Sequence, residues 1–84
     1  MQSGLFRKSS MPLERNTEME RLAEADLLIG DADRAVAHQM IEIERLRAEG
    51  HNTTKAEELL RAFQRTLTTL EEDRQRIFRN IRLN

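Results

Sequence analysis

Apolar residues recur at heptad spacing through the first half of the chain. This is the a/d pattern of a helix that packs along one seam. One line of the pattern comprises Leu22, Ile29, Val36 and Ile43, and the intermediate positions are Ala25, Ala32, Gln39 and Leu46. We predict a helix over 16–49, capped by Asn16 or Thr17, with Glu18 and Glu20 in its first turn. Gly30 leaves the phase of the pattern unchanged, so a continuous helix is favoured over a break at Gly30.

The second half of the chain repeats the pattern over 54–82. Its two heptad lines comprise Leu60, Leu67, Arg74 and Ile81, and Ala56, Phe63, Leu70 and Ile77. Arg74 is the only charged residue on these lines. A buried arginine without a partner is unfavourable, so we expect Asp26 or Asp33 of the first helix to bind it.

A short turn separates the two helices. It comprises Gly50, His51, Asn52, Thr53 and Thr54. Glycine ends a helix well because it adopts the left-handed conformation, and Arg45 and Arg47 precede it in the last turn. Thr54 followed by Glu57 fits a capping box, with Asn52 and Thr53 as alternative caps. A turn over 50–53 predicts an all-α, antiparallel two-helix hairpin with arms of about 45 Å, in which facing residue numbers sum to roughly 103.

The turn and the leucines after it carry a family resemblance. They follow the pattern L-x3-G-H-[DN]-T-x2-A-x2-L-L, formed by Leu46, Gly50 to Thr53, Ala56, Leu59 and Leu60, with Leu67 and Leu70 beyond. The chain resembles a group of small, functionally uncharacterised bacterial helical-hairpin proteins over Leu22 to Ile77. Asn52 stands where the group more often has Asp, and Phe63 is bulkier than the usual aliphatic residue. The resemblance implies a fold and no activity, cofactor or partner.

Residues 1–15 show no apolar period, and they contain Gly4, Pro12 and several serines. We expect a flexible arm that orders on contact with another surface through Leu5, Phe6 and Leu13. Met11 is a second candidate translation start.

Composition narrows the possible functions. The chain of 84 residues has no cysteine and two histidines, which removes disulfides and thiolate metal sites. Its net charge of -1 disfavours a polyanion binder, since nucleic-acid modules usually carry a basic excess. No apolar run approaches the roughly 18 residues of a membrane span, and no signal-peptide core is present. We therefore expect a cytoplasmic protein that does not associate with membranes.

The two histidines offer little chemistry. His38 precedes Glu42 by one helical turn, a spacing that suits a metal, but nothing completes the site and a solvated face is favoured. His51 follows the turn glycine and is expected to stabilise the turn. No Glu-x-x-His pair of a di-iron bundle occurs, and no nucleophile and base are brought together. The sequence therefore predicts no enzyme, no metal site and no cofactor.

Four arginines lie near the C-terminus around Phe78, and they are a candidate phosphate-binding surface. They are Arg74, Arg76, Arg79 and Arg82. In the predicted hairpin they lie beside the acidic start of the first helix, with Glu18, Glu20, Glu24 and Asp26 nearby. Pairing between the two ends is favoured over binding of nucleic acid, although each exposed pair contributes only about 0 to 1 kcal/mol.

Several large apolar residues flank the seam or lie outside it, and two helices alone cannot cover them. They are Leu28, Met40, Ile41, Leu59 and Phe78. We expect them to form the interaction surface of a homodimer, which would be a four-helix bundle. The predicted function is a non-enzymatic protein interaction module or structural hairpin. A nucleic-acid-associated regulator that uses the arginine-rich C-terminal end is the alternative.

Overall fold

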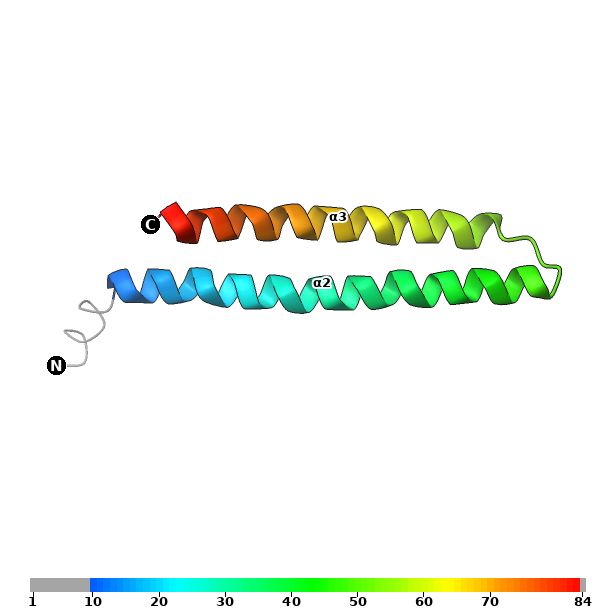
Figure 1. The fold of residues 1–84 in the computed structure, drawn as a ribbon, viewed down its shortest axis with the longest axis horizontal. Helices are drawn as coiled ribbons and strands as arrows, with labels where there is room; N and C mark the ends of the chain where they lie inside the picture. The colour runs from blue at the N-terminus through cyan, green and yellow to red at the C-terminus, as the bar shows by residue number, and fades with distance from the viewer. Residues whose placement is uncertain (1–9, 84) are drawn as a thin grey trace.

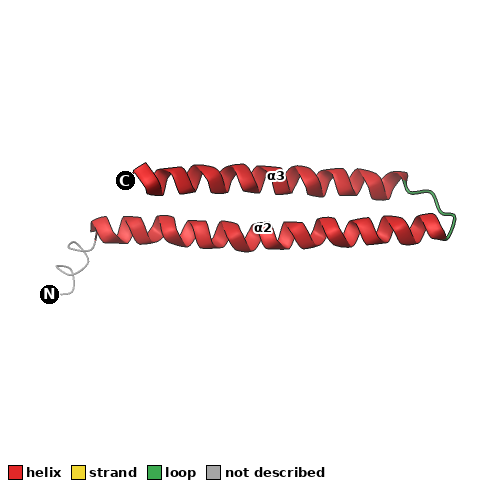
Figure 2. Ribbon diagram, in the orientation of Figure 1, coloured by secondary structure: helices red, strands yellow, loops and turns green. Residues whose placement is uncertain are grey.

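The protein is an antiparallel hairpin of two long helices, as the heptad pattern predicts. The computed structural model describes residues 10–83, with side chains over 17–82. Helix α2 covers Ser10–Ala48 and helix α3 covers Thr54–Leu83. The two helices lie side by side along their lengths (Figure 1), and no strand occurs in the described part (Figure 2).

The predicted seam is the contact surface between the helices. Every residue on the predicted a and d lines of both helices is shielded at least partly from solvent. Among the described side chains only Ala25 and Ile43 are buried, with exposed fractions of 7% and 6%, and neither is completely inaccessible. Ion pairs that join Arg47 to Glu57 and Arg74 to Asp26 agree with the predicted register. The core therefore consists of the predicted residues, but few of them are buried.

The start of α2 differs from the prediction. The helix begins at Ser10 and not at Asn16 or Thr17, so Glu18 and Glu20 lie well inside it. Pro12 is compatible with this earlier start, because the first four amides of a helix have no partner within the helix. Residues 10–15 of the predicted arm are therefore helical in their backbone. Leu5 and Phe6 lie outside the described residues, and the side chain of Leu13 lies outside them as well.

Helix α2 passes through Gly30 without a break and ends at Ala48, two residues before the predicted turn glycine. Gly50 has a φ of 78°, the left-handed conformation. The amide of His51 donates to the carbonyl of Leu46 at 2.9 Å, and that of Gly50 donates to Arg47 at 3.0 Å. This pair of bonds is the Schellman motif, which satisfies carbonyls that the helix end leaves free.

Helix α3 is capped by Thr53, one of the two alternatives to Thr54. The carbonyl of Thr53 accepts the first helical bond, from the amide of Glu57 at 2.8 Å. Its hydroxyl donates to the carboxylate of Glu57 at 2.9 Å. Asn52 supports the same end, since its side-chain oxygen accepts the amide of Thr54 at 2.8 Å. Thr54 is therefore the first helical residue and not the cap.

Candidate interaction surfaces

The five apolar residues predicted to lie outside the core are all exposed. They are Leu28, Met40, Ile41, Leu59 and Phe78. The structure adds Met19 and Leu27, which the sequence analysis did not single out. Leu27 and Ile41 are the most exposed of the set, at 71% and 68%.

These exposed residues do not form one continuous surface. Successive helical residues are rotated by about 100°, so Leu27 and Ile41 lie on the side of α2 that faces away from α3. Leu28 and Met40 lie on opposite flanks of the hairpin, because twelve residues separate them and their directions differ by about a third of a turn. The hairpin therefore presents an outer face on α2 and two narrower flanks.

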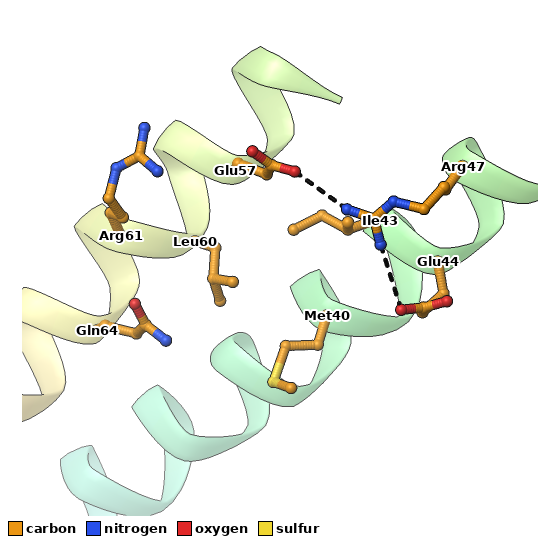
Figure 3. Close-up of a pocket in the computed structure, with 8 residues that line it drawn as sticks. All are labelled: Met40, Ile43, Glu44, Arg47, Glu57, Leu60, Arg61 and Gln64. Atoms are coloured by element: carbon orange, nitrogen blue, oxygen red, sulfur yellow. Dashed lines mark hydrogen bonds and ion pairs between the residues drawn. The ribbon is translucent and has the colours of Figure 1, made fainter. Parts of the chain in front are cut away.

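One flank contains an open groove of about 390 Å³ near the turn (Figure 3). It is lined by Met40, Ile43, Glu44, Arg47, Glu57, Leu60, Arg61 and Gln64. Arg47 bridges the two helices at one end, since its guanidinium lies 3.1 Å from the Glu57 carboxylate and 3.3 Å from that of Glu44. Figure 3 shows Ile43 and Leu60 between the two helices, with Met40 beside them on α2. The groove has an apolar floor and a charged rim.

A polar seam residue near this groove also has a partner that the sequence analysis did not identify. The side-chain amide nitrogen of Gln39, Nε2, donates to the backbone carbonyl of Ala56 at 2.9 Å. This bond explains how a glutamine occupies a d position, since a half-buried amide without a partner is unfavourable.

The second polar seam residue, Arg74, binds Asp26 and not Asp33. Its Nε donates to Asp26 Oδ1 at 2.5 Å. Its guanidinium also lies over the ring of Phe78, 6.0 Å from the centroid, and Arg82 lies 5.9 Å from the same centroid. The pair is partly exposed to solvent, at 35% for the arginine side chain and 55% for the aspartate side chain.

Arg74→Leu is expected to preserve or raise the thermal stability. The lost ion pair is exposed and contributes about 0 to 1 kcal/mol, whereas a half-buried leucine on the seam contributes on the order of 1 kcal/mol. If Arg74 specifies pairing, the variant also has a looser oligomeric state, as expected when a polar seam residue is lost. Thermal unfolding and sedimentation measure the two effects.

Arg76→Leu is the matched control, because Arg76 pairs with Asp73 on its own helix and not across the seam. A fall in nucleic-acid affinity with unchanged stability and assembly in Arg74→Leu would instead assign the residue to a phosphate-binding surface.

The wider charge pairing between the two ends of the hairpin is wrong except at Arg74. Arg79 and Arg82 have no carboxylate within ion-pair distance among the described side chains, and Glu18 pairs with Arg21 on its own helix at 3.8 Å. Glu18 and Arg76 pair within their own helices, because holding a partner one turn away costs less side-chain entropy than reaching to another helix. The sequence offers Arg79 and Arg82 no carboxylate at that spacing.

His51 lies in the turn, where a structural role is expected, and His38 lies on the expected solvated face of α2. His51 acts through its backbone amide, and its exposed ring lies 3.5 Å from Glu49. His38 is exposed beside Glu42, whose carboxylate binds Arg45. The hydrogen bond from Arg45 lowers the pKa of Glu42. In residues 10–83, no three histidine or acidic side chains form a cluster that could bind a metal.

Comparison with known proteins adds no relative: no family model, curated protein or solved structure matches the chain. The resemblance of the turn motif therefore stays a prediction. Within residues 10–83, neither helix contains an apolar stretch that could span a lipid bilayer.

Proposed function

We propose that this chain is a non-enzymatic helical-hairpin module that binds protein surfaces by helix packing and self-associates as a homodimer. The observation that carries the proposal is the imbalance between its core and its surface. Two side chains are buried in the described part, whereas seven large apolar side chains are exposed. Ordering a chain costs roughly 1.5 kcal/mol per residue, which so thin a core offsets poorly. Covering the exposed residues with another helical surface would supply the missing apolar burial.

The charges and the ring at the C-terminal end favour this function over binding of nucleic acid. Two of the four arginines, Arg74 and Arg76, are already bound to carboxylates of the same chain, whereas Arg79 and Arg82 are not. The ring of Phe78 has guanidinium groups of two arginines near it, so it is not a free platform for a base. The net charge of -1 also gives little long-range attraction for a polyanion.

Sedimentation equilibrium of the full chain at micromolar concentration tests the self-association. We expect a species of twice the 9.9 kDa chain mass. A folded species that stays at the chain mass at every concentration would contradict the homodimer and leave the exposed apolar residues to other partners.

A pull-down from cell lysate, with and without nuclease, tests the class of partner. Partners that remain bound after nuclease treatment fit a protein interaction module. Binding that nuclease abolishes, and that weakens steeply with salt, would support the nucleic-acid alternative instead.

A further inference from the structure

The outer face of α2 has a pattern that matches a second copy of itself. Leu27 and Ile41 lie at its centre, both exposed by more than two thirds. Arg34 lies midway between them, seven residues from each. We propose that two copies of the chain pack through this face with their α2 helices antiparallel and the two-fold axis at Arg34. This inference rests on the proposed self-association and specifies its interface.

The row formed by Leu27, Arg34 and Ile41 is self-complementary about that axis. In an isologous contact, a residue at a given distance before the axis meets the residue at the same distance after it in the other copy. Leu27 of one copy therefore meets Ile41 of the second copy, and the reverse contact forms at the other end. Both contacts bury side chains that the single hairpin leaves in water. At the axis Arg34 meets Arg34 of the second copy, and each guanidinium contacts Asp31 of its own chain, which offsets the like charges.

A row of charges beside the apolar row selects the antiparallel direction. It runs from acidic to basic along α2 as Glu24, Asp31, His38 and Arg45, all exposed. In the antiparallel pair, Glu24 lies opposite Arg45 of the second copy, which also binds Glu42 and Glu49 of its own chain. Asp31, which binds Arg34, lies opposite His38. A parallel pair would instead place this row against the row of Ala23, Gly30 and Ala37 of the second copy, where Glu24 and Arg45 find no opposite charge. The opposite charges of Glu24 and Arg45 therefore favour the antiparallel arrangement.

The row on the other side of the apolar row has small residues over its middle part. Ala23, Gly30 and Ala37 recur there at heptad spacing, and Glu44 continues the row. A Cβ built on Gly30 would meet only the Arg34 guanidinium, at 3.7 Å. The part of the row from Ala23 to Ala37 therefore places no large side chain beside the apolar contact. The outer face thus combines apolar contact and charge complementarity for a second copy.

Cysteine cross-linking tests this interface directly, because the natural chain has no cysteine. Leu27→Cys and Ile41→Cys are made as separate variants, one of them carrying an affinity tag. They are mixed unfolded, refolded together and treated with a short bismaleimide. We expect a cross-linked heterodimer. Each variant alone should remain uncross-linked, because its two cysteines would lie fourteen residues apart along the interface, about 21 Å.

Thr69→Cys is the control, since Thr69 is exposed on the other helix and outside the proposed interface. It should give no cross-link. Cross-linking of Leu27→Cys with itself would indicate a parallel pair and overturn the proposal. A wild-type dimer in sedimentation without a cross-link between the two variants would overturn this interface but not self-association. A wild-type monomer would overturn both, and would leave the face for a different protein.

Discussion

Ile43→Ala is expected to lower the free energy of unfolding by about 2 to 4 kcal/mol, the usual loss when a buried isoleucine is truncated. Ile43 is 6% exposed and is one of two buried side chains in the described part of the hairpin. Few other residues could compensate for it. Because a small domain has only a few kcal/mol of net stability, we expect the variant to be largely unfolded near 37 °C. Chemical denaturation followed by circular dichroism measures the effect.

Leu59→Ala is the control for that substitution, since Leu59 is 45% exposed and lies outside the seam. Its truncation should change the free energy of unfolding of the single hairpin by about 0.5 kcal/mol or less. Equal losses for the two variants would show that the stability does not come from the seam between α2 and α3.

Gly50→Ala is expected to lower the free energy of unfolding by about 1 to 2 kcal/mol. Gly50 has a φ of 78°, and a Cβ in this conformation approaches its own backbone. The space around the glycine is open, so this cost is conformational and not steric contact with other parts of the fold. Thermal unfolding with a two-state analysis gives the value.

Gly30→Ala is expected to raise the free energy of unfolding, which is the opposite of the effect of Gly50→Ala. Gly30 lies inside α2, where alanine is favoured over glycine by about 0.5 to 1 kcal/mol. The added methyl group meets only a flexible guanidinium. A higher free energy of unfolding for Gly30→Ala, together with a lower one for Gly50→Ala, would confirm that backbone conformation decides both effects. A fall for both would point instead to lost packing around α2.

The sequence predicts the fold well because the heptad pattern and the turn carry the same information. The apolar lines specify which side of each helix is covered, and Gly50 specifies where the chain reverses. The start of α2 could not be predicted in this way. Its first turns have no apolar period, and Pro12 is compatible both with an irregular arm and with the beginning of a helix.

The surface was less predictable than the seam. Two aspartates one helical turn on either side of Ile29 were equivalent partners for Arg74 by spacing, and only the structure selects Asp26. Leu27 was missed because a single leucine outside the heptad lines is common on protein surfaces. Its spacing from Arg34 and Ile41 was the available signal, and it is meaningful only once the structure shows which side of α2 is free.

The tight connection between the helices also has a consequence for the order in which contacts form during folding. Near the turn, Gln39 and Ala56 are 17 positions apart in sequence, whereas Asp26 and Arg74 at the far end are 48 apart. Closing a short loop is entropically cheaper than closing a long one, so we expect contacts near Gly50 to form first and the helices to associate progressively away from it. Substitutions near the turn should then change mainly the rate of folding, and substitutions near Asp26 mainly the rate of unfolding.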